Sequence, residues 1–273
     1  MQLSVVIITF NEEANLGRTL ESVKPLVSDG KGEIIIVDSG STDRTVEIAT
    51  SYGAKVFVEE WKGFSAQKNS AIDKARGDWI LSLDADEEVD RDLPVLILHV
   101  TSEWQPPPKK ELLAAMGFNI SRPDANGYWI RRRNKFMQRW IEHGGYWPDP
   151  KLRLFRRGAG RFENRLVHED IVVEGKTGNL RSGAIIHHSY PTISDYIEHM
   201  NRYSSLGAEM VMAKGKVRFS FLNIAVRPLI TFIYNYFFRL GFLDGKEGLL
   251  LHLNHAVYVS WKYAKAYELS QKQ

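Results

Sequence analysis

The sequence has no cysteine, so disulfides, thiolate metal sites and cysteine nucleophiles are excluded. It also has no Gly-x-Ser-x-Gly elbow, and no Gly-x-Gly-x-x-Gly follows the first apolar run, which disfavours a dinucleotide dehydrogenase. The N-terminus enters an apolar strand at once, without the basic segment, apolar stretch and cleavage site of a secretory signal. These absences predict a cytoplasmic protein that works without a covalent cysteine intermediate.

A long uninterrupted apolar run is also missing. The stretch Phe219–Leu240 is the most apolar, but Arg227-Pro228, Asn235 and Arg239 break it, and a spanning helix needs roughly 20 apolar residues. Its aromatic residues, with basic residues just before it, predict an interfacial helix that contacts the inner face of the cell membrane. A buried core helix or a dimer interface is the alternative. The flanking basic residues are Lys214, Lys216 and Arg218.

Charge is unevenly distributed along the 273 residues. Residues 1–100 hold 10 Lys and Arg against 18 Asp and Glu, whereas residues 101–273 hold 26 against 15. An acidic first part suits a divalent cation, and a basic second part suits phosphate-bearing or anionic-membrane partners, although a solvated surface explains both equally well. With 44% apolar and 25% charged residues the chain is expected to be folded, and no nucleic-acid partner is predicted.

The first hundred residues alternate strand and helix signals, as in a doubly wound, mostly parallel sheet. Strands are predicted at 3–8, 34–38, 55–58 and 79–83. Helices are predicted from the spacing of Leu16, Leu20 and Val23, from a cap at residues 41–43 to Tyr52, and over 65–76. After Leu98 a proline-rich connector at 105–110 leads to strand-like segments at 117–122, 128–136 and 151–156. We therefore predict a nucleotide-binding half at 1–104, an acceptor half with a small sheet at 105–190, and a helical region at 191–273.

Two acidic clusters follow apolar runs. Asp38 opens the segment Asp-Ser-Gly-Ser-Thr-Asp, and Asp84-Ala85-Asp86 follows the strand predicted at 79–83. In an open parallel sheet, ligands bind beyond the carboxyl ends of the strands, so Thr9 and Asp38 are predicted to hold the ribose or phosphates of a nucleotide. The Asp84–Asp86 pair is predicted to hold Mg²⁺ or Mn²⁺, with Asp86 as the main ligand and Asp84 on the ribose or the metal. The alternatives are turn chemistry at Asp38 and helix-capping charge after Asp86, at Glu87-Glu88.

Together with Thr9-Phe10-Asn11-Glu12-Glu13 after the first strand, these clusters resemble the inverting glycosyltransferases of family 2, which have the GT-A fold. The resemblance is strongest to lipopolysaccharide core β-1,4-glucosyltransferases, through Val167-His168-Glu169 and the Gly-Phe-Leu-Asp-Gly segment at 241–245. It implies that a UDP-sugar donor, with glucose as the expected sugar, contacts Thr9, Asn11, Glu12, Asp38 and Lys68. Where family members often have two acids, this chain has Val37-Asp38, so Asp38 must act alone.

The resemblance also implies a carboxylate base that takes the proton of the acceptor hydroxyl. Glu169 is the predicted base and Asp170 its substitute. His188, in His187-His188, is predicted as a further metal ligand, with a structural histidine pair as the alternative. Arg153, Arg156 and Trp147 are predicted to bind the acceptor, a lipid-linked oligosaccharide or lipopolysaccharide core.

Two other classes remain open from the sequence. A nucleotidyltransferase would share the sheet, but it usually has a glycine-rich, basic loop where this chain has Thr-Phe-Asn-Glu-Glu. A noncatalytic nucleotide-binding membrane adaptor would need no base.

Overall fold

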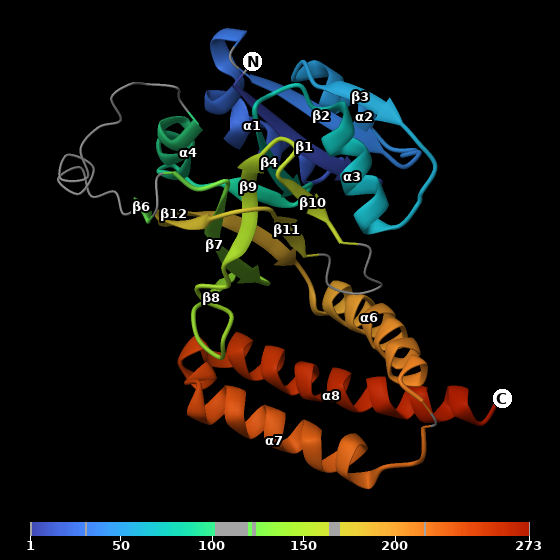
Figure 1. Ribbon diagram of the computed structural model, residues 1–273. Helices are drawn as coiled ribbons and strands as arrows, with labels where there is room; N and C mark the ends of the chain where they lie inside the picture. Colours follow the sequence, from blue (N-terminus) through green and yellow to red (C-terminus); the bar gives the residue numbers. More distant parts are fainter. Residues whose placement is uncertain are drawn as a thin grey trace. The chain divides into compact units, whose positions relative to one another are not determined.

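The structure, a computed structural model, describes residues 2–30, 32–101, 120–121, 124–163, 170–215 and 217–272. Strands and helices alternate in the first hundred residues, and long helices follow residue 193 (Figure 1). The strands are β1 Leu3–Thr9, β2 Gly32–Asp38, β3 Lys55–Val58, β4 Trp79–Asp84, β5 Glu87–Val89, β6 Ile120–Ser121, β7 Gly127–Phe136, β8 Arg139–Ile141, β9 Lys151–Arg156, β10 Gly160–Phe162, β11 Ile171–Val173 and β12 Thr177–Tyr190. The helices are α1 Leu16–Val27, α2 Thr45–Ser51, α3 Phe64–Lys74, α4 Leu93–Thr101, α6 Ile193–Ala213, α7 Arg227–Ile233 and α8 Gly245–Ser270, with short turns η1 Ser28–Gly30, η2 Leu222–Val226, η3 Tyr234–Phe238 and η4 Gly241–Asp244.

The chain divides into two compact units. The first takes in the described parts of residues 1–132, 150–165 and 169–187, and the second those of residues 133–149 and 188–273. The predicted connector at 105–110 lies outside the described residues, as do parts of the segment predicted at 117–122. The boundaries predicted at residues 104 and 190 therefore stay predictions.

The main sheet has the strand order β3-β2-β1-β4-β9-β7-β12-β5. The strands β1 to β4 are parallel, and they place Thr9 beside Asp38 and Ile8 beside Asp84 in register. Beyond β4 the sheet becomes antiparallel through β9 and β7. The strands expected to form a small acceptor-side sheet therefore extend the main sheet, because the backbone of β9 pairs directly with the exposed edge of β4. A separate two-stranded sheet, β10–β11, lies outside this order.

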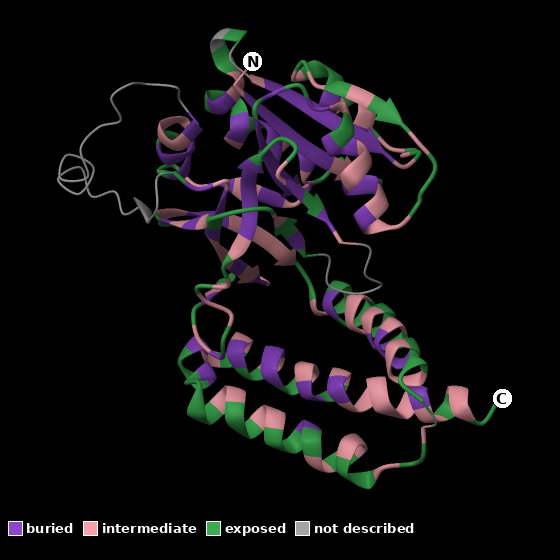
Figure 2. Cartoon of the chain, viewed as in Figure 1, coloured by how far each residue is buried: buried purple, intermediate pink, exposed green. Residues whose placement is uncertain are grey.

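Helices cover both faces of the parallel strands, as the continuous apolar character of the strands predicts. One face of β1, with Val5, packs against Leu16 and Leu20 of α1. The opposite face, with Val6, packs against Ile72 of α3. All of these side chains are at most 4% exposed, which accounts for the purple interior in Figure 2. The doubly wound α/β class is thus confirmed.

Local signals fixed several boundaries correctly. The predicted strand at 55–58 coincides with β3, and Gly53 after α2 has φ +74°, a conformation that favours glycine at a helix end. Gly77, after α3, lies so close to β1 that a Cβ atom would be 2.5 Å from the backbone nitrogen of Ser4. The alternative in which Glu87-Glu88 cap a helix does not apply, because these residues lie in β5 and pair antiparallel with β12.

The second unit is built mainly from helices. Its core joins Phe136 and Ile141 to Tyr196 of α6 and Leu251 of α8. Helix α6 begins with a capping box in which the Thr192 hydroxyl and the Asp195 carboxylate each accept a backbone N–H of the other residue. Within the part of the chain that the structure describes, no helix combines the length and apolarity that crossing a bilayer requires.

One buried acid ties the turn after β8 to these helices. Asp244 is 2% exposed and accepts hydrogen bonds from the backbone nitrogens of Glu142 (3.2 Å) and His143 (2.9 Å). Its Oδ1 also lies 2.9 Å from Nδ1 of His143. The Gly-Phe-Leu-Asp-Gly segment at 241–245 therefore has a structural role that its sequence did not reveal.

Candidate active site

Asp38 ends β2 with a carboxylate that is held from several directions. It is 1% exposed, and Oδ1 accepts hydrogen bonds from the hydroxyls of Thr9 (2.8 Å) and Ser41 (2.5 Å). Oδ2 accepts the backbone N–H groups of Gly40 (2.9 Å) and Ser41 (2.8 Å). Thr9 and Asp38, predicted as partners from their positions at strand ends, thus lie together. Charge-assisted bonds of this kind give the turn after β2 a fixed shape.

The loop after β1 lies against the same turn. Asn11 has φ +54°, and its Oδ1 accepts the backbone N–H of Thr42 at 2.9 Å. Glu12 donates its backbone N–H to the Thr45 hydroxyl at 2.7 Å, and its carboxylate accepts a hydrogen bond from Asn15 at 2.9 Å. These bonds make Asn11 and Glu12 wall residues that join the first two strand ends.

Electrostatics link Glu12 to the second acidic cluster. Burial raises the pKa of the Glu12 carboxyl, and the negative charges of Asp86, Asp43 and Asp84 raise it further, while the hydrogen bond from Asn15 opposes them. Carboxylates that raise one another's pKa form a site that favours a bound cation. Both acidic clusters predicted from the sequence therefore contribute to one negative region at the carboxyl ends of the parallel strands.

Asp84 is paired with a cation on each oxygen. Nζ of Lys68 lies 2.7 Å from Oδ1, and Nη2 of Arg153 lies 2.6 Å from Oδ2. Burial raises the pKa of Asp84, but the charges of Arg153 and Lys68 outweigh it, and the pKa lies well below its usual value. Lys68 itself is 7% exposed and lies over the ring of Phe162, 5.2 Å from its centroid. Asp84 is consequently ionised, and its charge is already balanced.

Glu87 completes this network. It is fully buried, and its Oε1 lies 2.7 Å from Arg153 and 3.2 Å from Nη1 of Arg132. Its Oε2 accepts the backbone N–H of Asp84 at 3.1 Å. Removal of one partner from such a buried group leaves a charge uncompensated, so the network fixes the turn that presents Asp86.

Asp86 has a different partner. Its Oδ2 lies 3.2 Å from Nε2 of His187, and its side chain is 27% exposed. Burial raises the pKa of Asp86, but the His187 ring outweighs it and the pKa is lowered. Asp86 is therefore an ionised carboxylate that pairs with one residue, His187, whereas Asp84, whose side chain is 29% exposed, pairs with a cation on each oxygen.

Comparison with known proteins agrees with this geometry. The family model "Glycosyl transferase family 2" matches residues 4–159, which include β1, β2, β4 and both acidic clusters. The chain is 34% identical to the lipopolysaccharide core biosynthesis glycosyltransferase LpsC of Rhizobium meliloti, over 98% of this chain and 93% of that protein. The chain belongs to glycosyltransferase family 2.

Two further relatives extend the comparison. An uncharacterized glycosyltransferase of Rickettsia typhi is 30% identical over 99% of this chain and 88% of its own length. The mannosyltransferase PcManGT from Pyrobaculum calidifontis, solved with GDP-Man and Mn²⁺, has a TM-score of 0.51 and 14% identity, and the match covers 100% of this chain and 88% of that one. At that identity the likeness shows the fold alone, and it is the GT-A fold.

The donor groups of this family 2 chain suit a hard divalent cation. Asp86 offers a carboxylate and His187 an imidazole, and both are ligand types that Mg²⁺ or Mn²⁺ accepts when phosphate oxygens and water complete the shell. Among the residues that the structure describes, no three His, Asp or Glu side chains are grouped closely enough to hold a metal ion by themselves.

Two of the predicted metal ligands, Asp84 and His188, are less well placed for a metal than Asp86 and His187. Both oxygens of Asp84 already pair with cations, which leaves Asp86 as the better ligand of the two. His187, and not the predicted His188, pairs with Asp86. Successive residues of a strand point to opposite faces, so only one of two adjacent histidines on β12 can face this turn. Knowledge of the β12 register would have identified it, because His187 lies opposite Glu87 of β5.

The predicted base falls partly outside the described region. Glu169 is not among the described residues, and Asp170, its substitute, is exposed just before β11 in the first unit. The backbone carbonyl of Asp170 accepts the N–H of Glu163 at 3.0 Å, which holds the start of β11 near the end of β10.

The predicted acceptor residues are Arg153 and Arg156 of the first unit and Trp147 of the second. Arg153 is 6% exposed and is taken up by Asp84 and Glu87, so it has no surface to offer an acceptor. Arg156 is exposed, and its guanidinium lies 4.7 Å from the centroid of the Trp79 ring. Trp147 belongs to the second unit, where it is half-buried. The alternation of β9 separates Arg153 from Arg156, because they lie on opposite faces of the strand.

Sequence reasoning missed three residues of the site: Glu87, Arg132 and His187. It also missed Gln67, which is fully buried, donates to the Ser39 hydroxyl at 3.3 Å, and has an Oε1 without a hydrogen-bond partner among the described residues. Its place before Lys68 in Gln-Lys-Asn was the available signal. Asn69 of the same segment holds β10 through two bonds with the Phe162 backbone.

Proposed function

We propose that this enzyme transfers a hexose, with glucose as the first choice, from a UDP-sugar to a hydroxyl of a lipid-linked saccharide such as the lipopolysaccharide inner core, with inversion at the anomeric carbon. The observation that supports it is the shared negative edge of the sheet, where Thr9 and Asp38 adjoin the Asp84–Asp86 turn. Family membership favours this reading over a nucleotidyltransferase or a noncatalytic adaptor.

In this mechanism the chain first binds the nucleotide. Asp38, held by Thr9 and Ser41, offers its carboxylate edge to the ribose or base, and the loop with Asn11 and Glu12 closes the side of the pocket. Lys68 stands beside Asp84 as the nearby cation. Such preorganised groups position the donor before any bond breaks.

Asp86, with His187 behind it, would hold Mg²⁺ or Mn²⁺, which supplies positive charge to the departing diphosphate. The Arg153–Glu87 network keeps the Asp86 turn in place. Glu169, with Asp170 as the substitute, is proposed to remove the proton of the acceptor hydroxyl as it attacks from the face opposite the diphosphate.

The acceptor proposal rests on the relatives. LpsC is named as a lipopolysaccharide core biosynthesis enzyme, and the chain matches nearly all of it. A lipid-linked acceptor would bring the protein to a membrane surface, and we assign that peripheral contact to the C-terminal helices.

The deciding experiment compares Asp86→Ala with Asp92→Ala in a UDP-sugar turnover assay with Mn²⁺. Asp92 is an exposed acid six positions after Asp86. We expect Asp86→Ala to lose at least about 10²-fold in kcat while retaining its fold, and Asp92→Ala to match the parent. Full activity of Asp86→Ala would refute the mechanism.

A companion assay tests the base. Glu169→Gln should keep UDP binding and lose transfer, and Asp170→Asn should retain transfer. The reverse result would make Asp170 the base. The anomeric configuration of the product, read by NMR, tests inversion.

A further inference from the structure

The segment before and through α7 exposes an unusual amount of apolar surface. Residues 221–238 form a continuous helix in which the wide turns η2 and η3 flank α7. Exposed residues run along this helix in Figure 2. The apolar face, as defined here, consists of Leu222, Leu229, Ile230, Ile233, Phe237 and Phe238, which are 38% to 75% exposed.

These side chains form one stripe. Leu229, Ile233 and Phe237 recur at intervals of four residues, and Ile230, Tyr234 and Phe238 form the adjacent row at the same spacing. Residues four apart lie one above another on a helix, so the two rows make a single continuous strip. The other side of the helix packs on α8, where the Ser260 hydroxyl bonds to the carbonyl of Ile224 at 2.7 Å. The strip therefore faces away from the core of the second unit.

The charge around the strip has one sign. From residue 210 to residue 243 the sequence has no Asp or Glu, and it carries only basic residues, Lys214, Lys216, Arg218, Arg227 and Arg239. Among the described ones, Arg218 precedes the strip and Arg239 follows it, and both are exposed. An apolar strip bounded by cations complements anionic headgroups above an acyl layer.

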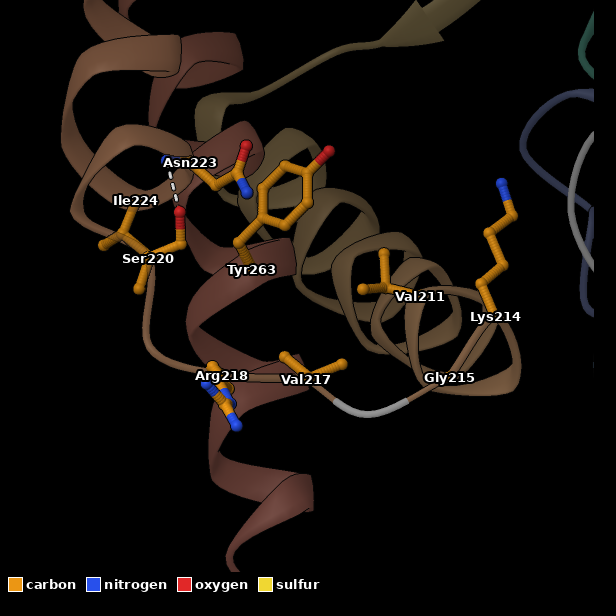
Figure 3. Close-up of a pocket in the computed structure, with 9 residues that line it drawn as sticks. All are labelled: Val211, Lys214, Gly215, Val217, Arg218, Ser220, Asn223, Ile224 and Tyr263. Atoms are coloured by element: carbon orange, nitrogen blue, oxygen red, sulfur yellow. Dashed lines mark hydrogen bonds between the residues drawn. The ribbon is translucent and has the colours of Figure 1, made fainter.

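A pocket of about 310 Å³ opens at the N-terminal end of the strip. Figure 3 shows the ring of Tyr263 and the amide of Asn223 side by side in it. Lys214 and Arg218 also line the pocket, on different sides, and the Lys214 ammonium extends away from the Tyr263 ring. Ser220 also lines it and accepts the backbone N–H of Asn223 at 3.3 Å. The pocket lining includes no acidic residue, so its hydrogen-bond donors and basic residues suit a phosphate group.

We propose that the apolar face lies in the surface of an anionic lipid bilayer, parallel to its plane, with a lipid phosphate in the Lys214–Arg218 pocket. This rests on the peripheral contact included in the proposed function and assigns it to a defined surface. The wide turn η3 exposes the aromatic side chains of Tyr234, Phe237 and Phe238, which suits a helix that lies in the interface and does not cross it.

A second copy of this chain is a poorer occupant. A symmetric dimer through the apolar face would set Arg218, Arg227 and Arg239 of one copy near the same basic set of the other, with no acid between residues 210 and 243 to balance them. Anionic headgroups supply that balance.

The absence of cysteine gives a direct test. A single cysteine is introduced as Phe238→Cys, or as Val95→Cys on α4 of the first unit, where the native side chain is 48% exposed, and is labelled with a polarity-sensitive fluorophore. With vesicles of phosphatidylcholine and phosphatidylglycerol we expect a blue shift at position 238 and none at position 95. Neutral phosphatidylcholine vesicles should give much weaker binding. An unchanged spectrum at position 238, or equal binding to both vesicles, overturns the proposal.

Variants separate the strip from the pocket. Phe238→Ser with Leu229→Ser should lower vesicle partitioning by about tenfold for each side chain, as expected when buried apolar area is lost. Lys214→Gln with Arg218→Gln should lower it by about fivefold for each charge, and this loss should shrink at high salt. Lys24→Gln with Lys176→Gln, two exposed cations of the first unit, is the matched control and should bind as the parent does. If Lys24→Gln with Lys176→Gln lowers vesicle partitioning as much as Lys214→Gln with Arg218→Gln does, the pocket assignment is overturned.

Two outcomes keep this inference distinct from the proposed function. Metal-dependent turnover without any vesicle binding overturns the membrane surface and leaves the transferase standing. Vesicle binding without turnover overturns the proposed transferase activity and leaves the membrane surface standing. A dimer in the absence of lipid that Phe238→Ser abolishes would identify a second copy as the occupant and overturn the proposal.

Discussion

Nε2 of His187 lies 3.2 Å from Oδ2 of Asp86, which joins β12 to the turn between β4 and β5. The contact depends on the antiparallel pairing that sets His187 opposite Glu87. Asp84, two residues before Asp86, is instead paired with Lys68 and Arg153, one on each oxygen. The two acids of the same short motif thus have different electrostatic surroundings, and Asp86 is the better candidate for binding a cation.

His187→Gln should weaken metal-stimulated activity. The substitution removes the imidazole that supports Asp86, so we expect the Mn²⁺ concentration for half-maximal stimulation to rise about 10- to 100-fold. A manganese titration of turnover at saturating donor measures it. His188→Gln is the matched control, because it changes the adjacent residue of β12, and it should shift the titration little. Equal shifts for both variants would contradict the assignment of His187.

The parallel part of the fold was predictable because its signals are local. The strand at 55–58 and the helix through Leu16 and Leu20 were confirmed, since apolar runs and one-face spacing depend only on neighbouring residues. Thr9 and Asp38 were found for the same reason, as strand ends of one sheet share an edge. The place of Glu87 in a strand was not predicted, because nothing nearby in the sequence reveals its partner strand, β12.

Arg153 shows more clearly why some residues of the site could not be predicted from the sequence. The sequence predicted that Arg153 binds the acceptor, but β9 pairs with β4 inside the sheet, and Arg153 neutralises Asp84 and Glu87. A buried cation becomes recognisable only when the pairing of distant strands supplies its anions. Whether Trp147 or Arg156 contacts an acceptor stays a prediction.

Arg153→Met should destabilise the first unit strongly. It leaves two carboxylates without their shared cation, and breaking such a buried pair costs about 3–5 kcal/mol. It should also raise the pKa of Asp84, because the Arg153 charge is a principal force lowering it. Urea unfolding measures the first effect.

The comparison variant for Arg153 is Arg156→Met on the same strand. Arg156 is exposed and lies over Trp79, an arrangement worth about 0.5–1 kcal/mol. If Arg153→Met lowers the free energy of unfolding by no more than this, the ion pairs of Arg153 with Asp84 and Glu87 contribute little to stability.

Asp38→Asn should abolish nucleotide binding and lower stability together. The amide nitrogen would replace one of the two carboxylate oxygens. It would then face either the two hydroxyls that donate to Oδ1 or the two backbone N–H groups that donate to Oδ2, at a cost of about 2–3 kcal/mol. Thr9→Val removes a single donor and should cost about 1 kcal/mol. For both variants, calorimetric titration measures the affinity for UDP, and thermal unfolding measures the stability. UDP binding by Asp38→Asn at the parental affinity would remove Asp38 from the nucleotide site.

The second unit should lose stability on mild acidification because of His252. Its ring is 1% exposed, neither nitrogen has a hydrogen-bond partner among the described residues, and burial, with the nearby charge of His255, lowers its pKa to about 4 from 6.5. Between those values the unfolded state binds the proton more readily than the folded state. The free energy of unfolding is therefore intact above pH 6.5 and falls by up to about 3 kcal/mol as the pH drops to 4.

His252→Met replaces the imidazole by an apolar side chain that cannot take up a proton. The rings of Tyr146 and Tyr236 lie nearby, with centroids 5.8 and 6.2 Å from that of the His252 ring. It removes the titrating group, so its stability should change less between pH 6.5 and pH 4 than that of the parent. Hydrogen exchange of the α8 amides across this range measures the difference within the second unit. Parallel loss in both proteins would assign the acid sensitivity to other groups, because a neutral buried imidazole can destabilise a fold only by taking up a proton.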